Sequence, residues 1–413
     1  MKELFDFDNT PTRRGTNCVK WDEAEEGMLP LWVADMDFAV APSIQKAIIK
    51  RAMHPCYGYT MVPDDYYESI QNWFAQRHNW HIDRQEILYT IGVVPAIAAI
   101  LKAVCQVGDN VAILTPIYNC FFSNIRNAGC QTVSVPLKMK SEELKVKSSL
   151  PDEQNNSSFL ISNSSLSKAL IDWDGLEAAL AHEKTTVLLL CNPHNPVGRI
   201  WTAEELQHIA QLCQKHHVMV ISDEIHNELT RPGSEYTPWG TIGEEYQAMA
   251  AICTSPSKSF NIAGLQNANI IVRDAELRRK IDRAINLNET CDVNPFGVEA
   301  VIAAYNEGGE WLDALREYIW ANFDFASAYL TRELPQLRIT NLQATYLMWV
   351  DCRELHVDNL ASRLKEEANV WFADGEIYGE AGRGYLRINL ATSRSILTEA
   401  LHRFVQWVKT NNL

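Results

Sequence analysis

The sequence predicts an α/β protein, with a large domain built on a mostly parallel, seven-stranded sheet and a smaller α+β domain. Between about residues 85 and 275, short β-branched runs alternate with helical stretches, which is typical of crossover units around a parallel sheet. After about residue 290 the order changes to helices followed by strand-like runs. A chain of 413 residues is also long enough for two or three domains of ordinary size.

The large domain is expected to contain seven strands, each a short apolar run. They are Glu86–Thr90, Asn110–Thr115, Gln131–Val135, Thr185–Cys191, Val218–Ser222, Ala250–Thr254 and Asn269–Val272. Two helices between them are marked by apolar residues at i, i+3, i+4 and i+7, one beginning near Val94 and the other near Leu206. Thr202 and Glu205 have the spacing of a capping box at the start of the second helix.

The smaller domain is expected to contain three strands and a terminal amphipathic helix. The strands are Ala344–Val350, Asn369–Phe372 and Gly384–Leu390. We therefore divide the chain into an N-terminal arm that belongs with the small domain (1–45), a large domain (46–288) and a small domain (289–413). The polar stretch from Lys138 to Lys168 is rich in Ser, Asn, Glu and Lys, and we expect a surface excursion between large-domain elements, without a chemical role.

Composition excludes several classes of function. The formal charge of -15 opposes binding to nucleic acid and to anionic membranes. No apolar run approaches the roughly 18 residues of a spanning helix, and the first residues lack the apolar core of a signal peptide, so we expect a cytoplasmic protein. The ten cysteines contain no C-x-x-C pair, and the chain has no H-E-x-x-H motif and no G-x-G-x-x-G after the first strand. A metal hydrolase and a nicotinamide enzyme are therefore disfavoured.

Four segments that follow strand candidates carry residues suited to chemistry. They are Gly92–Pro95, the proline-rich turn Cys191–Gly198 with Asn195, the acidic pair after Ile221 that begins with Asp223, and the hydroxyl-rich turn around Lys258. Open α/β sheets bind ligands beyond the carboxyl ends of their strands, so these segments should converge. Each could also have a purely structural role: a strand-to-helix turn, a rigid turn, a local cap and a solvated lysine.

The order N-P-x-N-P-x-G, then D-E, then S-x-x-K resembles the fold-type I pyridoxal-phosphate enzymes, the aspartate aminotransferase superfamily. A closer resemblance, over nearly the whole chain, is to the MalY/PatB group of carbon–sulfur lyases, the cystathionine β-lyase and cystalysin type. The segments that carry it are 12–22, 31–38, 58–60, 222–226, 257–261 and 386–390. The resemblance implies the fold of that superfamily, with pyridoxal phosphate bound in the large domain.

The resemblance also implies roles for single residues around the cofactor ring. Lys258 matches the lysine that holds the cofactor as a Schiff base and then removes the Cα proton of the substrate. Asp223 matches the carboxylate that keeps the pyridine nitrogen protonated. Asn195 would donate to the phenolic oxygen O3′. Tyr118 would stack on the ring and take part in catalysis, although a buried core tyrosine is the alternative.

The phosphate of the cofactor would rest on the backbone N–H groups of Val93 and Val94 and on the hydroxyls of Ser255 and Ser257. Aminotransferases place an arginine eight residues after the lysine, whereas this chain has Gln266 there. In the lyase group a tyrosine of the neighbouring subunit helps, and Tyr59 matches it. The resemblance therefore implies a homodimer with shared active sites.

Arg387 is similar to the arginine that grips the substrate α-carboxylate in a bidentate pair, and backbone near Ala34 and Asp35 would complete the grip. A structural salt bridge is the alternative for Arg387. His226 stands three residues after Asp223, where many aminotransferases carry tyrosine. This difference favours β-elimination from a sulfur-containing amino acid, giving pyruvate, ammonia and a thiol. Two alternatives stay open: transamination, and a regulatory role through binding a transcription regulator, as one member of the group has.

Overall fold

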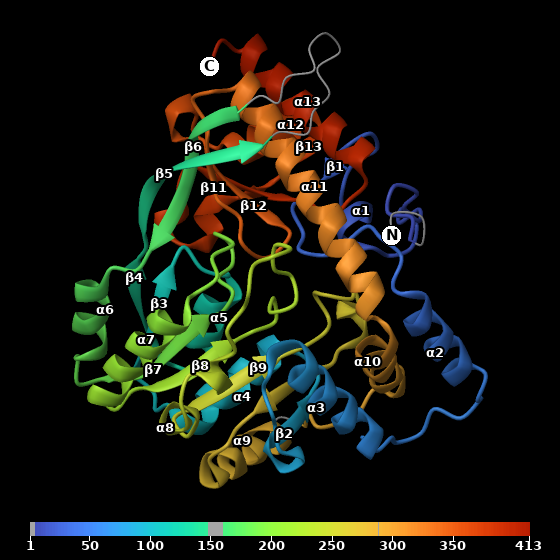
Figure 1. Cartoon of the computed structure of the whole chain (residues 1–413), viewed down its shortest axis with the longest axis vertical. Helices are drawn as coiled ribbons and strands as arrows, with labels where there is room; N and C mark the ends of the chain where they lie inside the picture. Colours follow the sequence, from blue (N-terminus) through green and yellow to red (C-terminus); the bar gives the residue numbers. More distant parts are fainter. Residues whose placement is uncertain (1–4, 148–159, 288) are drawn as a thin grey trace.

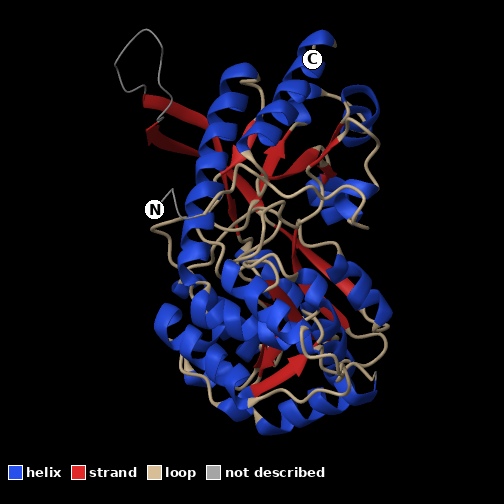
Figure 2. Ribbon diagram, turned by 90° about the vertical axis from the view of Figure 1, so that its right-hand side faces the viewer, coloured by secondary structure: helices blue, strands red, loops and turns tan. Residues whose placement is uncertain are grey.

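The computed structural model describes residues 5–147, 160–287 and 289–413, arranged as two β-sheets with helices packed around them. Figure 1 shows a seven-stranded sheet in the lower half of the molecule and a six-stranded sheet in the upper half. In Figure 2, turned by 90°, helices flank the strands in both halves. The described residues contain no helix with the length and apolarity needed to cross a membrane.

The lower sheet confirms the expected seven strands, with bounds that differ from expectation by no more than one residue. In spatial order they are β2 (Ile87–Thr90), β10 (Ala268–Ile271), β9 (Ala250–Thr254), β8 (Met219–Asp223), β7 (Thr185–Cys191), β3 (Asn110–Thr115) and β4 (Gln131–Pro136). The five strands from β9 to β4 pair in parallel. β10 runs antiparallel to both of its neighbours, so the sheet is mostly but not wholly parallel.

Alternate side chains of the central strands enter two different cores, which is why these strands read as continuous apolar runs. Along β7, Val187 and Leu189 pack with one group of helices, whereas Leu188 and Leu190 face the other side. The first group is α4 (Val93–Val104), α5 (Cys120–Asn127) and α9 (Ala275–Leu287). The second side is covered by α3 (Asp64–His78), α6 (Trp173–Leu180), α7 (Ala203–Lys215) and α10 (Pro295–Glu307). The expected capping box at Thr202 and Glu205 is present at the start of α7.

The upper sheet contains two of the three strands expected near the carboxyl terminus, those at 344–350 and 384–390, together with four further strands. The third expected strand, 369–372, corresponds to β13 (Val370–Trp371), which lies outside this sheet. The order of the upper sheet is β14 (Ala373–Asp374), β15 (Tyr385–Asn389), β12 (Leu347–Asp351), β11 (Arg338–Thr340), β6 (Leu160–Leu170) and β5 (Lys138–Lys147). The helices of this half are α11 (Gly309–Glu333), α12 (Leu360–Ala368) and α13 (Arg394–Thr410). The N-terminal region joins it through a short parallel pair, β1 (Leu29–Pro30) with β13 (Val370–Trp371).

The polar stretch from Lys138 to Lys168 does not form the surface excursion between large-domain elements that its composition suggested. β5 and β6 pair as an antiparallel hairpin, and β6 continues the upper sheet by pairing in parallel with β11 (Figure 1). Residues 148–159 of the stretch lie outside the described residues. The expectation was wrong because sheet pairing uses backbone groups, which an unpaired sheet edge supplies whatever the polarity of the added side chains.

The division of the chain at residue 288 stays a prediction. α10 begins seven residues later, at Pro295, yet it packs against α2 (Pro42–Ala52) and α3 of the lower half. α11, which follows α10, rises along the upper half (Figure 1). The passage between the two halves therefore lies between α10 and α11 rather than before α10. The remaining short helices are α1 (Val19–Asp22) and α8 (Glu244–Gln247).

The turn after β7 contains Gly198, which a larger residue could not replace without steric overlap. Gly198 has φ +67°, and an added Cβ would overlap the side chain of Leu342 and lie 2.9 Å from the Ala344 carbonyl oxygen. Its own carbonyl accepts hydrogen bonds from the backbone N–H groups of Gln343 and Ala344. This close approach fixes the turn that carries Asn195 against the loop before β12.

We predict that Gly198→Ala lowers the free energy of unfolding by more than Gly233→Ala does. Gly233 has φ +83° but open space around its Cα, so its substitution costs only the backbone conformation, roughly 1–2 kcal/mol. Gly198→Ala adds overpacking of about 1–3 kcal/mol to a similar backbone cost. Urea unfolding of both variants under the same conditions measures the difference. Equal losses would contradict the packing described for this turn.

Candidate active site

The carboxyl ends of β7, β8 and β9 bring three of the predicted site residues together. Asp223 is the last residue of β8, Asn195 lies four residues after β7, and Lys258 lies four residues after β9. The three strands are adjacent and parallel, so their ends open at the same edge of the sheet, which faces the upper half of the molecule (Figure 1). The expected convergence is therefore seen for this group.

Lys258 is partly buried and lies between the two sheets, where it reaches residues 31–38. Its Nζ donates a hydrogen bond of 2.6 Å to the carbonyl oxygen of Ala34. Burial lowers the pKa of Lys258 to about 8, and the positive charge of Arg387 acts in the same direction. The negative charges of Asp35 and Asp223 oppose this lowering of the pKa. A substantial fraction of this amine is consequently neutral near physiological pH.

The two acidic residues at the end of β8 face different surroundings. Asp223, 3% exposed, accepts a hydrogen bond of 3.1 Å from the Ile225 backbone N–H, and burial raises its pKa to about 7. Glu224 points into a closed polar network and accepts from the Ser222 hydroxyl, the Trp239 backbone N–H and the Tyr236 hydroxyl. Asp223 is therefore the acid available to a bound cation, whereas Glu224 holds the surrounding loops.

Arg387 reaches the same place from β15 of the upper sheet. Its Nη1 lies 3.4 Å from Oδ1 of Asn195, and its Nη2 donates to the Trp32 carbonyl oxygen at 2.9 Å. The guanidinium also lies over the ring of Tyr378, 4.7 Å from the centroid. Its Nε has no hydrogen-bond partner among the described residues. No carboxylate forms an ion pair with it there, so a structural salt bridge does not account for this buried cation.

His226 and Tyr118 border the group. Burial lowers the pKa of His226 to about 3, with further lowering by the charges of Lys258 and Arg387, so the ring is neutral at physiological pH. Its Nδ1 has no hydrogen-bond partner in the described part of the chain. Tyr118 follows β3 and is partly buried, and burial raises the pKa of its hydroxyl. The charges of Asp223 and Arg387 both act on Tyr118, which places it beside the group.

The predicted phosphate-binding groups lie at the same edge of the lower sheet. Val93 and Val94 form the first turn of α4, where backbone N–H groups have no partner within the helix. Ser255 donates its hydroxyl hydrogen to the Asn267 carbonyl at 2.6 Å and accepts from the Ser257 backbone N–H at 3.1 Å. The Ser255 hydroxyl is thus engaged within the fold, and Ser257 is the more exposed of the two.

Tyr59 is not brought to this group within one chain. It lies in the segment between α2 and α3, which extends away from the body of the molecule at the lower right of Figure 1. Its side chain is fully exposed, as are large parts of Met53, Tyr57 and Met61 in the same segment. Its predicted role requires a second subunit and stays a prediction.

One segment organises the site without having been singled out for that purpose. Residues 31–38, which we call the strap, run across the gap between the two sheets, and side chains from both sheets donate to strap carbonyls. Asn389 of β15 donates to the carbonyls of Val33 and Asp35, both at 2.6 Å. Asn261, three residues after Lys258, donates to the carbonyls of Met36 and Phe38.

Sequence reasoning missed Asn261 and Asn389 as strap-holding residues, and it missed Tyr346, whose hydroxyl donates to the Ala34 carbonyl at 2.9 Å. A signal existed for Asn389, because an amide within an apolar strand needs partners when buried. Tyr346 and Tyr378 resemble ordinary core aromatics, and no sequence signal marks them. The strap residues Ala34 and Asp35 were predicted as part of a carboxylate grip; the structure shows the Ala34 carbonyl receiving hydrogen bonds from Lys258 and Tyr346.

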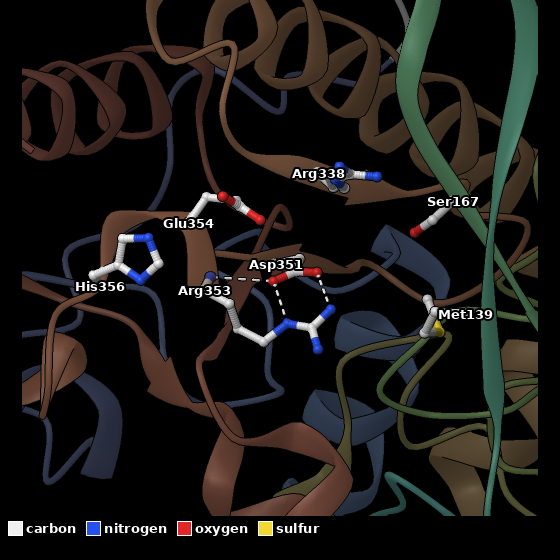
Figure 3. A pocket seen from close by; sticks show the side chains of 7 residues that line it. All are labelled: Met139, Ser167, Arg338, Asp351, Arg353, Glu354 and His356. Atoms are coloured by element: carbon white, nitrogen blue, oxygen red, sulfur yellow. Dashed lines mark hydrogen bonds and ion pairs between the residues drawn. The ribbon is translucent and has the colours of Figure 1, made fainter.

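A separate pocket of about 480 Å³ lies at the upper sheet, away from this group. It is lined by Met139, Ser167, Arg338, Asp351, Arg353, Glu354 and His356 (Figure 3). Arg353 binds the Asp351 carboxylate through two hydrogen bonds, Nε to Oδ1 at 2.8 Å and Nη2 to Oδ2 at 2.6 Å. The pocket contains none of the predicted site residues, and its central acid is already paired.

Comparison with known proteins identifies the family to which the chain is similar. The model of the family described as aminotransferase class I and II matches residues 26–404. Cystathionine β-lyase PatB of Bacillus subtilis (strain 168) is 34% identical over 406 residues, 97% of this chain and 98% of that protein.

Two solved structures extend this similarity to the fold. Cystalysin from Treponema denticola, a structure that contains a pyridoxal 5′-phosphate cofactor, is similar with a TM-score of 0.89 and 31% identity, covering 99% of this chain and all of that chain. The pyridoxal-phosphate-bound C–S lyase from Staphylococcus hominis has a TM-score of 0.87 and 28% identity, with 98% of this chain and all of that chain covered.

We predict that Lys258 loses its proton near pH 8 in protein freed of bound small molecules, well below the ordinary lysine value of about 10.4. Competitive acylation between pH 6 and 11, with mass spectrometry of the peptide that contains Lys258, measures the pKa. Arg387→Met should raise this pKa because the guanidinium charge lowers it. A titration at the ordinary lysine value would contradict the described burial.

Proposed function

The chain belongs to the aminotransferase class I and II family, and on that premise we propose that it is a pyridoxal-phosphate-dependent carbon–sulfur β-lyase. It would act on cystathionine, cysteine or a related sulfur-containing amino acid and release pyruvate, ammonia and a thiol. The observation that carries the proposal is the placement of the buried Asp223 and the partly buried Lys258 beyond the ends of adjacent strands, with the buried Arg387 reaching them from the upper sheet. The names of the similar proteins, a cystathionine β-lyase and a C–S lyase, support the choice of reaction.

The residues present fit the cofactor. Asp223 is a buried carboxylate whose only hydrogen bond among those described comes from a backbone N–H, so a protonated pyridine nitrogen would supply the cation it lacks. Nδ1 of His226 is a buried polar atom without a hydrogen-bond partner in the described chain. The first N–H groups of α4, at Val93 and Val94, suit a phosphate. Ser257, and less directly Ser255, would border it.

When bound, pyridoxal phosphate supplies an electron sink for the bond broken at the substrate Cα. The protein supplies the rest. Lys258, with a pKa of about 8, can both release its amine for binding and accept a proton at physiological pH. Asp223 would hold a positive charge on the ring nitrogen, Asn195 would donate a hydrogen bond to the phenolic oxygen, and Tyr118 would lie beside the ring. Arg387, buried and free of carboxylate partners in the described chain, holds the substrate carboxylate.

Release of the leaving group requires little assistance from the protein. A β-thiolate is a good leaving group, so elimination needs removal of the Cα proton by Lys258 and no strong acid near sulfur. His226, whose pKa is about 3, stays neutral and adds no positive charge beside the ring oxygen.

We predict that purified protein with pyridoxal phosphate converts L-cystathionine to pyruvate and a thiol, and that Lys258→Ala lowers the rate by at least about 100-fold, the usual contribution of a positioned general base. Pyruvate is measured by a coupled dehydrogenase and the thiol by a disulfide reagent. Incubation with 2-oxoglutarate is the matched control. Glutamate formed faster than pyruvate would replace the proposed lyase with an aminotransferase.

We further propose a homodimer in which Tyr59 of each subunit completes the phosphate site of the other. The exposure of Tyr59 and of the apolar residues around it supports this proposal. Tyr59→Ala and Lys258→Ala should each be nearly inactive alone. After denaturation and refolding of an equal mixture, random pairing leaves one intact site in half of the dimers, so roughly a quarter of the wild-type activity should return. No recovery, with mixed dimers present, would place Tyr59 outside the neighbouring site.

A further inference from the structure

Two strap residues, Asp35 and Asp37, form a cluster of four charges with Lys20 and Arg13 from the N-terminal segment. Lys20 is fully buried, and its Nζ lies 2.9 Å from Oδ2 of Asp37 and 3.8 Å from Oδ1 of Asp35. Arg13 bridges the same two acids, with Nη2 at 2.7 Å from Asp35 and Nη1 at 3.0 Å from Asp37. Trp21 adds a hydrogen bond from Nε1 to Asp37 at 2.8 Å.

The Lys20–Asp37 pair is the fixed part of this cluster. Although burial alone would raise the pKa of Asp37, the charge of Lys20 and the hydrogen bond from Trp21 hold it below the ordinary aspartate range. Burying a lysine without a paired carboxylate is costly, so Lys20 and Asp37 hold each other in place. Arg13 is more accessible, with a side chain 22% exposed, and it links this fixed pair to Asp35.

The cluster is connected to Lys258 through the strap backbone at Ala34. Ala34, whose carbonyl accepts the hydrogen bond from Lys258, immediately precedes Asp35. Arg13 binds the Asp35 carboxylate and, through Nη1, the Met36 carbonyl at 2.9 Å. The guanidinium therefore holds side chain and backbone within two residues of the Lys258 contact.

The cluster also meets Lys258 through charge. The charge of Arg387, from β15, lowers the pKa of Lys258, whereas Asp35 of the strap, Asp223 of β8 and Cys120 of α5 raise it. The neutral ring of His226 also lies near the Lys258 amine. Of the two carboxylates, Asp35 has a partner that lies outside the catalytic group, namely Arg13. The charge that Asp35 presents to Lys258 therefore depends on Arg13.

We propose that Arg13 is a positioning residue of the catalytic centre, which acts on Lys258 through the strap by binding Asp35 and the Met36 carbonyl. The role of Lys258 as the reacting amine rests on the proposed function, whereas the coupling of Arg13 to Lys258 does not. The Lys20–Asp37 pair holds Arg13 in place through the ion pair between Arg13 and Asp37. Because Asn261 and Asn389 also hold the strap backbone, loss of Arg13 should alter the electrostatics of Lys258 more than its position.

Opposite shifts in the Lys258 pKa are expected from the two partners. Arg13→Met removes the closer of the two cations beside Asp35 and leaves only Lys20 at 3.8 Å, so Lys258 should keep its proton to a higher pH, by roughly half a pH unit or more. Asp35→Asn removes that charge, so the Lys258 pKa should fall. In the double variant the effect of Arg13→Met should largely disappear, because Arg13 acts through Asp35. A purely structural role for Arg13 would not produce shifts of opposite sign.

Arg14→Met is the matched control. Arg14 lies next to Arg13, and its hydrogen bonds to described residues all go to backbone carbonyls, those of Trp21, Ala24, Glu25 and Met28. Its loss should destabilise the same N-terminal segment and leave the Lys258 pKa unchanged. Arg13→Lys keeps the charge and should restore most of the wild-type titration.

The experiment uses the full-length protein in two forms. In the holoenzyme, the pH dependence of the cofactor absorbance reports the proton held at the Lys258 nitrogen. In protein from which the cofactor has been removed, competitive acylation of Lys258 gives its pKa directly. Thermal unfolding of each variant identifies a failure to fold, and the Arg13→Lys variant then supplies the comparison.

The outcomes separate this proposal from the proposed function. Equal Lys258 titrations for Arg13→Met and Arg14→Met, or a full Arg13→Met shift in the Asp35→Asn background, would overturn the role of Arg13. The expected opposite shifts in a protein without lyase activity would leave the role of Arg13 intact and remove only the reaction assigned to the site.

Discussion

Hydrogen bonding of the strap backbone is the constraint on which the site depends. Residues 31–38 cross the gap between two sheets with few strand partners of their own, so their buried carbonyls need donors from elsewhere. Lys258 and Asn261 from the lower half and Arg387 and Asn389 from the upper half supply them. The same bonds that satisfy the strap therefore fix Lys258 and Arg387 relative to each other.

Burial in that gap explains why the charges of the site behave as they do. Desolvation is the main cause of the lowered pKa of Lys258 and of the raised pKa of Asp223. Both shifts move the groups toward neutrality, so each gains when a ligand of opposite charge binds. In a protein with a formal charge of -15, the cations that an anionic ligand needs are held at this one place by a backbone segment, rather than by an overall positive surface.

The sequence predicts the lower sheet well because its strands are buried on both faces. Continuous apolar runs such as Val187 to Leu190 are typical of such strands, and the ends of parallel strands meet by a general rule, which placed Asn195, Asp223 and Lys258 together.

The β5–β6 hairpin was not predictable in the same way, since its partner β11 lies about 170 residues further along the chain and polar edge strands have no strong pattern. Tyr346 and Asn389 act through contacts between residues even further apart in the sequence. Tyr59 could not be placed because a single chain does not contain its expected partner.

The short spacing between the Trp32 and Ala34 carbonyls limits the distance between Arg387 and Lys258, the side chains that hydrogen-bond to them. Arg387 donates to the Trp32 carbonyl and Lys258 to the Ala34 carbonyl, two residues apart. Two residues of backbone span at most about 7 Å, so a carboxylate held by Arg387 and a proton taken by Lys258 must be close together. An α-amino acid meets this requirement because its carboxylate and its Cα proton are on neighbouring atoms. Under the proposed function, the strap would select for the α-amino-acid end of the substrate and leave the groups beyond Cβ to other parts of the protein. This separation of tasks is consistent with one scaffold serving lyases and aminotransferases, since these reactions share the removal of the Cα proton and differ in the bonds that break afterwards.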